Sequence, residues 1–167
     1  MRPGTPEDDA FLYDVFCTNW ENEIAALPDP KLVNHFLRIQ FTAQESRLED
    51  RYPSLQRYVV LHDGAPAGRL YLQRDPDVIH AVEMTMLPHY RSLGIGSQVC
   101  QDMFAEAREN EQKVSLRVGR GNTRAVGLYA SLGFRLVSTD DLDCYFEWTA
   151  REASVFNAAA LADAARI

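Results

Sequence analysis

A glycine-containing run at residues 91–96 constrains the fold of this chain more than any other feature of its sequence. The run reads Arg91-Ser92-Leu93-Gly94-Ile95-Gly96 and lies between a strand-like apolar segment, 79–87, and a long amphipathic helical pattern. Two glycines one residue apart let the backbone approach a ligand closely, and the helix that follows directs unpaired N–H groups toward it. The run therefore predicts a strand, loop and helix that bind a phosphorylated ligand.

The run differs from the two commonest phosphate-binding motifs. It lacks the Lys-Ser/Thr ending of a nucleoside-triphosphate loop and the third glycine of a dinucleotide fingerprint. A strand-to-helix turn also uses glycine for steric reasons alone, so a purely structural role for the run stays open. If the run binds a phosphate, the expected cofactor is neither ATP nor NAD.

A second motif follows about one βαβ unit downstream. After a strand-like segment, 114–118, the chain carries Asn122, Ala125, Leu128, Tyr129, Gly133 and Phe134. The two motifs, with Pro88-His89-Tyr90 leading into the first, resemble the GCN5-related N-acetyltransferase (GNAT) superfamily. Its patterns are Arg/Gln-x-x-Gly-x-Gly/Ala and Asn-x-x-Ala-x-x-Leu-Tyr-x-x-x-Gly-Phe, and both occur here in that order within residues 59–148.

The resemblance implies a fold, a cofactor and a reaction. The fold is α/β, with a central mixed twisted sheet flanked by about four helices. The reaction is direct transfer of an acetyl group from acetyl-CoA to a primary amine, without a metal. The acceptor stays open between a small cationic amine and a peptide N-terminus. One alternative is an acyl-CoA-binding regulatory or interaction protein without transferase activity, and another is binding of a nucleotide other than CoA.

The resemblance assigns the first motif to the cofactor. Backbone N–H groups from Leu93 to Ser97 are expected to bind the pyrophosphate, and Arg91 either adds a charge-assisted contact or flanks the loop. Met86 and Leu87 match positions whose backbone N–H groups polarise the thioester carbonyl, although their side chains equally suit a sheet core. The expected cofactor-binding residues are Met86, Leu87, Arg91, Ser92, Leu93, Gly94, Ile95, Gly96, Ser97 and Asn122.

Three further positions carry expected roles with a structural alternative for each. Glu83 is the only acid in the apolar segment 81–87, so it is the candidate general base, or else a solvated or amine-recognising carboxylate. Tyr129 matches the tyrosine that protonates the leaving thiolate in similar proteins, or else packs between helix and sheet. Asn122 either contacts the pantetheine arm or caps its helix. Some relatives carry an acid on the next strand, where this chain has Arg117.

Hydrophobic spacing predicts the order of helices and strands. Helices are expected at about 5–27, from 29 to before Tyr52, and at about 96–108 and 122–132. Strands are expected at 57–61, 68–72, 79–87, 114–118, 134–138 and 143–148, with Asp63-Gly64 as a hairpin turn. Residues 1–150 are expected to form one domain, and the alanine-rich residues 151–167 a helical or disordered tail.

Composition bears on partners and location. A formal net charge of −7 over 167 residues disfavours nucleic acid and suits a cationic acceptor. The absence of a long apolar run and of a signal-peptide pattern predicts a cytoplasmic protein that does not span a membrane. A homodimer is left open.

Cysteines and histidines predict no further chemistry. Cys17, Cys100 and Cys144 are isolated, and the four histidines have no metal-ligand spacing, so neither a disulfide framework nor a metal site is expected. The first two helices supply a set of aromatic and acidic residues that either recognises a cationic acceptor or forms ordinary core and surface. This set is Tyr13, Trp20, Glu21, Glu23 and Phe41.

Overall fold

Seven strands and the helices between them are present in the computed structural model, which describes residues 1–24 and 29–151. The strands follow the order β1-β2-β3-β4-β5-β7-β6, with parallel and antiparallel pairs, which confirms the predicted mixed sheet. The chain divides into two compact units. Unit 1 comprises residues 1–73 and 83–95, and unit 2 comprises residues 74–82 and those from 96 onward. The predicted tail, 152–167, lies outside the described residues.

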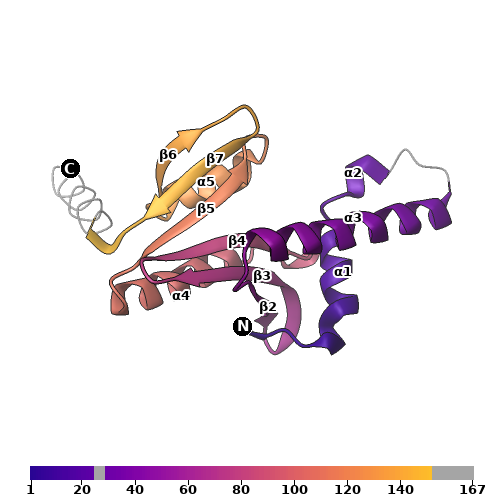
Figure 1. Ribbon diagram of the computed structural model, residues 1–167, viewed down its shortest axis with the longest axis horizontal. Helices are drawn as coiled ribbons and strands as arrows, with labels where there is room; N and C mark the ends of the chain where they lie inside the picture. The colour runs from indigo at the N-terminus through magenta and orange to yellow at the C-terminus, as the bar shows by residue number, and fades with distance from the viewer. Residues whose placement is uncertain (25–28, 152–167) are drawn as a thin grey trace. The chain divides into compact units, whose positions relative to one another are not determined.

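Unit 1 contains the N-terminal helices and an antiparallel group of strands (Figure 1). Its elements are β1 (Arg2–Pro3), η1 (Pro6–Asp8), α1 (Asp9–Cys17), α2 (Glu21–Ile24), α3 (Pro30–Arg51), β2 (Gln56–His62), most of β3 (Ala65–Asp75), the end of β4 (Val78–Met86) and η2 (Pro88–Tyr90). β2 pairs antiparallel with β1 and with β3. The turn between β2 and β3 has positive φ at Asp63 and Gly64, 51° and 80°, as a tight hairpin turn requires.

The first predicted helix is interrupted. α1 ends at Cys17, a turn follows, and α2 begins at Glu21. Thr18 accounts for the break, because its backbone N–H and its Oγ1 both donate to the Val15 carbonyl, at 3.2 and 2.8 Å, and so compete with a continued helical ladder. The predicted end of this helix, at Leu27, lies outside the described residues.

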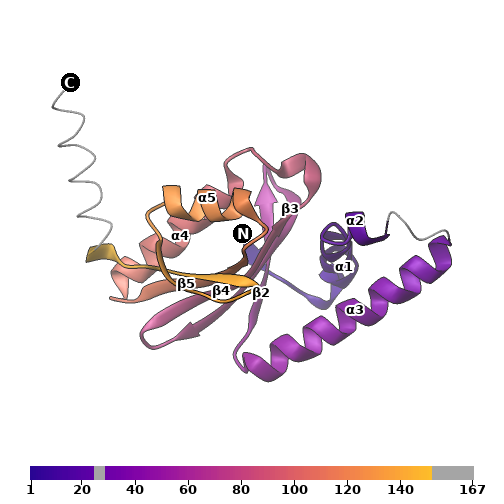
Figure 2. The same cartoon turned by 90° about the horizontal axis from the view of Figure 1, so that it is seen from above.

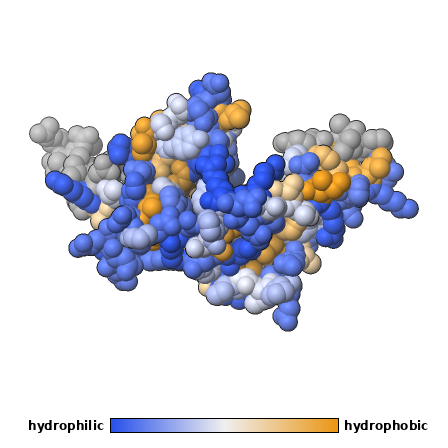
Figure 3. Space-filling model, in the orientation of Figure 1, coloured by the Kyte–Doolittle hydropathy of each residue, from blue (hydrophilic) through white to orange (hydrophobic). Residues whose placement is uncertain are grey.

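The second predicted helix forms as α3. The Asp29 side chain accepts a hydrogen bond from the Lys31 N–H at 2.8 Å, and Pro30 occupies the first helical position. Leu32, Phe36 and Ile39 on α3 are exposed, and Figure 3 shows apolar surface over this part of the helix. The inward side of α3 contributes Leu37 to the core of unit 1.

Unit 2 contains the C-terminal strands, and its helices α4 and α5 lie on the same side of β5 (Figure 2). Its elements are the start of β4, α4 (Ile95–Glu109) from Gly96, β5 (Lys113–Gly119), α5 (Thr123–Ser131), β6 (Arg135–Thr139) and β7 (Asp143–Trp148). β4 runs parallel to β5, and β7 lies antiparallel between β5 and β6. On α4, Val99, Met103 and Phe104 are buried, as their helical spacing predicts.

Candidate active site

The 91–96 loop turns sharply before α4. Ser92 has a φ of 67° and Gly94 a φ of 78°, and the helix begins at Ile95, one residue before the predicted start. Backbone turns with alternating φ sign and helix N-termini both present N–H groups in an arrangement that suits an anion. A Cβ on Gly94 would meet no atom within 4 Å, so this position needs glycine for its φ and not for space.

The Arg91 side chain is directed toward β4 and α1. Its Nε donates to the Met86 carbonyl at 2.9 Å, and its Nη2 donates to Thr18 Oγ1 at 3.1 Å. Of the two roles predicted for Arg91, these bonds support the flanking one, because they tie the start of the loop to the end of β4.

The end of β4 lies unusually close to β3. The Leu87 N–H donates to the Ala67 carbonyl at 2.9 Å, so a thioester can accept from this N–H only if that bond opens. A Cβ on Gly68 would lie 2.4 Å from the Thr85 carbonyl oxygen and 2.6 Å from the Met86 sulfur. Glycine at position 68 is therefore required by space, in contrast to Gly94.

The Glu83 carboxylate accepts from three side chains of unit 1. Arg69 donates to Oε1, Gln44 donates to Oε2, and Thr85 Oγ1 lies 3.4 Å from Oε1. The Glu83 side chain is 15% exposed. A carboxylate bound on both oxygens, once by a guanidinium, is held in one orientation and has its charge partly compensated.

Arg69 is a member of this site that the sequence analysis missed. It lies on β3 with 0% of its side chain exposed, and its Nη1 is 3.3 Å from the Leu12 carbonyl and 3.8 Å from Glu45 Oε1. Three aromatic rings have their centroids within 5.9 Å of its guanidinium carbon: Phe16, Phe41 and Tyr71. The available signal was an arginine inside a run of apolar residues, 67–72, because arginine is rarely buried without a partner.

Glu45 extends the cluster from Arg69 to β2. The Tyr71 hydroxyl donates to Glu45 Oε1 at 3.0 Å, and Arg57 Nε donates to Glu45 Oε2 at 2.9 Å. Burial raises the pKa of the Tyr71 phenol, which keeps it a neutral donor to this carboxylate. Alternating acids and cations thus connect α3, β2, β3 and β4 within unit 1.

Tyr129, in unit 2, lies in aromatic surroundings. It is 9% exposed on α5, with its ring centroid 5.5 Å from that of Phe134 and 6.3 Å from that of Phe146. Burial raises the pKa of the phenol, with a smaller contribution from Cys100, so the hydroxyl stays protonated over a wide pH range. The ring packs as the structural alternative predicts, and the hydroxyl keeps the proton that the catalytic role requires.

The second motif also contributes a helix cap. Asn122 Oδ1 accepts from the Ala125 N–H at 3.1 Å at the start of α5, which confirms the capping role. A contact between Asn122 and a pantetheine arm stays a prediction. Gly96 and Ser97 lie in the first turn of α4.

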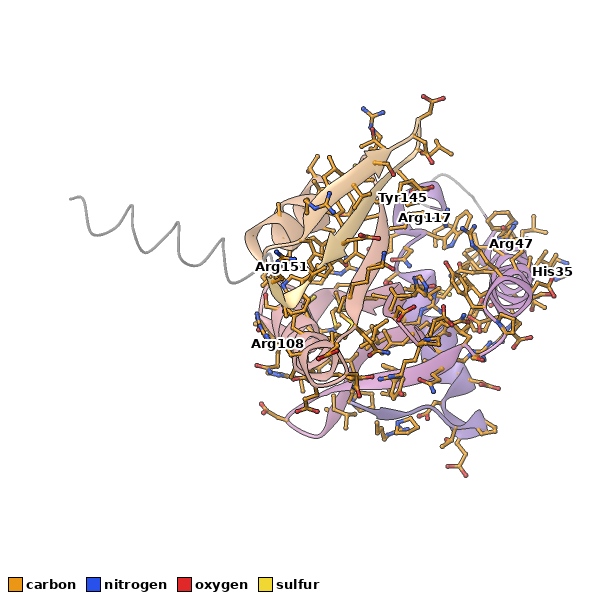
Figure 4. All side chains as sticks on the ribbon, turned by 60° about the vertical axis from the view of Figure 1, so that its left-hand side comes forward. His35, Arg47, Arg108, Arg117, Tyr145 and Arg151 are labelled. Carbon is orange, nitrogen blue, oxygen red and sulfur yellow. The ribbon has the colours of Figure 1, made fainter. Side chains whose placement is uncertain are left out.

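Arg117 lies on β5 where some relatives carry an acid. Figure 4 shows it close to Tyr145, its cross-strand partner on β7. Arg117 Nη1 is 3.5 Å from Asp143 Oδ2, and the Tyr145 hydroxyl donates to Asp140 at 2.8 Å. This strand therefore presents a paired cation at that position instead of a second carboxylate.

The aromatic residues considered as a lining for a cationic acceptor belong mainly to the core. Tyr13 is buried with the Arg38 guanidinium 4.2 Å from its ring centroid, and the Phe41 ring contacts it at 5.5 Å. Trp20 packs against Phe16. The core alternative thus holds for Tyr13 and Phe41, whereas Glu21 is exposed and the Glu23 side chain lies outside the described part of the chain.

Other reactive side chains are dispersed. His80 Nδ1 lies 2.6 Å from Ser115 Oγ, and its Nε2 lies 3.1 Å from Asp75 Oδ2. Burial raises the pKa of the Cys100 thiol to about 12, which disfavours the thiolate that a catalytic cysteine needs.

Within residues 1–24 and 29–151, no three His, Cys, Asp or Glu side chains are grouped so as to hold a metal ion. In the same part of the chain, no helix combines the length and apolar character of a membrane span.

Comparison with known proteins assigns the family. The model of the acetyltransferase (GNAT) family matches residues 13–134, and the chain belongs to this family. An N-alpha-acetyltransferase from Sulfurisphaera tokodaii is 38% identical over 60 residues, which cover 35% of this chain and 36% of that protein. The chain thus matches about a third of that relative's length.

Solved structures share the fold. The PaiA N-acetyltransferase of Thermoplasma acidophilum, in complex with coenzyme A, superposes with a TM-score of 0.67 at 18% identity and covers 89% of this chain and 96% of its own. A GNAT family acetyltransferase from Elizabethkingia anophelis, with acetyl-CoA bound, has a TM-score of 0.57 at 16% identity and covers 89% and 95%, respectively. These likenesses confirm the GNAT fold predicted for this chain.

Proposed function

We propose that this protein is an acetyl-CoA-dependent N-acetyltransferase that acts on a primary amine within a ternary complex. The observation that carries the proposal is the 91–96 loop, in which positive φ at Ser92 and Gly94 leads directly into the N-terminus of α4. Membership of the GNAT family supports the same cofactor, because relatives of this fold have been solved with CoA or acetyl-CoA bound.

The loop would hold the cofactor through its backbone. N–H groups from Leu93 to Ser97 would donate to the pyrophosphate oxygens, and Arg91 would keep the loop attached to β4 through its bond to the Met86 carbonyl. The backbone of Met86 and Leu87 is proposed to polarise the thioester carbonyl. Because the Leu87 N–H already donates to Ala67, Met86 is the favoured donor.

Glu83 and Tyr129 would handle the two protons of the reaction. The acceptor ammonium loses a proton to Glu83, directly or through water, and the neutral amine attacks the thioester carbonyl carbon. The carbon–sulfur bond then breaks, and Tyr129 donates its proton to the leaving thiolate. The nitrogen, now bonded to the acetyl group, releases its second proton, which restores the Tyr129 phenol directly or through water. The products are an N-acetylated amine and CoA.

The acceptor is proposed to be a primary amine that carries a positive charge, either a small amine or a peptide N-terminus. The net charge of −7 supports a cation. The N-alpha-acetyltransferase relative favours a peptide N-terminus, although the similarity covers only 36% of that protein.

One observation favours the alternative of acyl-CoA binding without transfer. Both carboxylate oxygens of Glu83 already accept hydrogen bonds, from Arg69 and Gln44, so an acceptor amine would have to share an oxygen with one of these donors. Under this alternative the protein binds acetyl-CoA, and a broad panel of amines gives no CoA release. Glu83→Gln and Tyr129→Phe then leave acetyl-CoA binding unchanged.

Calorimetric titration with acetyl-CoA tests the proposal, with ATP and NAD as controls. We expect micromolar affinity for acetyl-CoA alone, and loss of about 100-fold or more in Gly94→Asp, because a carboxylate would lie among the phosphate oxygens. Gly94→Ala is the matched control: it disturbs the φ of 78° without adding charge and should retain much more affinity. Wild-type affinity in Gly94→Asp contradicts the assignment of the loop, and CoA release with an amine panel separates transfer from binding.

A further inference from the structure

The Glu83 carboxylate is attached to a buried cation that no motif of the chain includes. Arg69 donates to Glu83 Oε1 from β3, and both residues belong to unit 1. We infer that Arg69 is a positioning residue for acetyl transfer: it holds the Glu83 carboxylate in the orientation from which Glu83 acts on the acceptor amine. The inference rests on the proposed function and extends it by one residue.

The burial of Arg69 is costly and only partly compensated. Its side chain is 0% exposed, and its Nε has no hydrogen-bond partner among the described residues. Glu45 is 3.8 Å away, beyond hydrogen-bond distance, so Glu83 is the carboxylate that Arg69 contacts directly. A residue selected for stability alone could be replaced by an apolar side chain, because buried ion pairs are often no better than apolar packing. A role of the Arg69–Glu83 ion pair in the reaction explains why the desolvation cost of burying Arg69 is retained.

The guanidinium cannot easily change its position. Its Nη1 donates to the Leu12 carbonyl of α1 at 3.3 Å and contacts the Tyr71 hydroxyl of β3 at 3.5 Å. The rings of Phe16 and Phe41, from α1 and α3, lie 5.5 and 5.9 Å from its central carbon. Because Arg69 is held from two helices and its own strand, the Glu83 oxygen bound to it is held as well.

A second donor fixes the other side of the carboxylate. Gln44 of α3 donates to Glu83 Oε2, and Thr85 contacts Oε1 at 3.4 Å while accepting from Asn19 at 3.4 Å. A carboxylate held on both oxygens meets the incoming amine in one fixed orientation. Fixed orientation of the reacting groups accelerates a bimolecular reaction, because less freedom has to be lost in the transition state. Arg69 is the charged member of this set and supplies its strongest bond.

A double-mutant cycle tests whether Arg69 acts through Glu83. The variants are Arg69→Met, Glu83→Gln and the double variant, assayed for CoA release with diaminobutane and with a tetraalanine peptide whose N-terminus is free. We expect Arg69→Met to lower kcat/KM for the better acceptor by about tenfold or more, with the acetyl-CoA Kd changed less than about twofold. In the Glu83→Gln background the same substitution should cost less than about twofold, because the group that it positions is already altered.

Two further variants separate positioning from folding. Arg69→Lys keeps the charge and should recover part of the lost kcat/KM, and it replaces Arg69→Met in the cycle if that variant does not fold. Glu49→Gln is the matched control, because it neutralises an exposed carboxylate of α3 that pairs with Arg57 and contacts neither Arg69 nor Glu83. It should leave kcat/KM within about twofold of the wild type.

The kcat/KM values of these variants distinguish a positioning role of Arg69 from a purely structural one. If Arg69→Met lowers kcat/KM equally in the wild-type and Glu83→Gln backgrounds, Arg69 supports the fold and not the orientation of Glu83. That result overturns this inference but leaves the proposed acetyl transfer intact. A wild-type protein that does not bind acetyl-CoA, or that acetylates neither acceptor nor any amine of the panel, overturns the proposed function and this inference with it. Loss in the wild-type background alone, with partial recovery in Arg69→Lys, supports the inference.

Discussion

Around Glu83 in unit 1 the neighbouring side chains are charged and polar, whereas around Tyr129 in unit 2 they are aromatic and apolar. Glu83 accepts from a guanidinium and an amide, and Tyr129 lies against the rings of Phe134 and Phe146. Both groups are mostly removed from water. The charge of the Glu83 carboxylate is compensated by its hydrogen-bond partners, whereas burial keeps the Tyr129 phenol neutral.

This difference determines which substitutions destabilise each region. A charged cluster is sensitive to the loss of one member, because the remaining charge is then buried without a partner. An aromatic cluster is sensitive to lost volume, because the cavity that remains is not refilled. The free energy of unfolding of selected variants distinguishes these two kinds of sensitivity.

The largest effect is expected in the aromatic region of unit 2. Phe104 is 1% exposed, and its ring stacks on Trp148 with the centroids 4.1 Å apart. Phe104→Ala should lower the free energy of unfolding by about 4 kcal/mol, measured by urea denaturation. Leu136→Ala is the control in the same unit, since Leu136 is 49% exposed and should change stability by less than about 0.5 kcal/mol. Similar losses in both variants would refute an aromatic core at this place.

A somewhat smaller loss is expected in the charged region of unit 1. Glu83→Leu leaves the Arg69 guanidinium buried without its directly bonded carboxylate, and should cost about 3 kcal/mol in urea denaturation. Arg69→Met combined with Glu83→Leu removes both charges and should recover most of that loss. If the double variant loses as much free energy of unfolding as the two single variants together, the stability of this region does not depend on pairing of the two charges, and the contrast with the aromatic region is wrong.

Alkaline pH should destabilise unit 2 through a group that burial keeps neutral. Burial raises the pKa of the Cys100 thiol from 9.0 to about 12. The unfolded chain therefore releases this proton first, so the stability contributed by Cys100 is complete below about pH 9 and falls by about 1.4 kcal/mol per unit as the pH rises toward 12. Urea denaturation across this range should give a shallower decline for Cys100→Ala than for the wild type. Equal slopes would indicate that the thiol is accessible to water.

The smallest effect on stability is expected from the tyrosine hydroxyl. Tyr129→Phe retains the ring contacts with Phe134 and Phe146 and should change the free energy of unfolding by less than about 1 kcal/mol. Turnover should nevertheless fall about tenfold or more while the acetyl-CoA Kd stays within about twofold, because the variant removes a proton donor and no cofactor contact. Undiminished turnover would assign Tyr129 to packing alone.

Features that depend on neighbours along the chain were predictable. Asp29 and Asn122 cap their helices, and the Asp63-Gly64 turn joins two strands, because caps and turns involve hydrogen bonds or φ values within a few residues. The break after Cys17 is also local, but the competing bonds of Thr18 were outweighed in the sequence by a continuing helical pattern.

Features that depend on distant residues were not predictable. Glu83 was identified as the only acid in the apolar segment 81–87, yet nothing in the sequence indicates that Arg69 and Gln44 contact it. Tyr13 and Phe41 suited both a binding surface and a core until their mutual contact was known.

The sequence by itself determined the family motifs, the order of the strands from β2 to β7 and of the longer helices, and the succession of strand, loop and helix around residues 91–96, because each depends on residue type and short-range spacing. Only the tertiary structure decided which side chains surround Glu83 and Tyr129 and that β7 lies between β5 and β6. The physical reason is that burial and pairing are properties of contacts between residues far apart in the chain. A carboxylate beside a guanidinium and a phenol among rings acquire different chemistry from neighbours that no local pattern specifies.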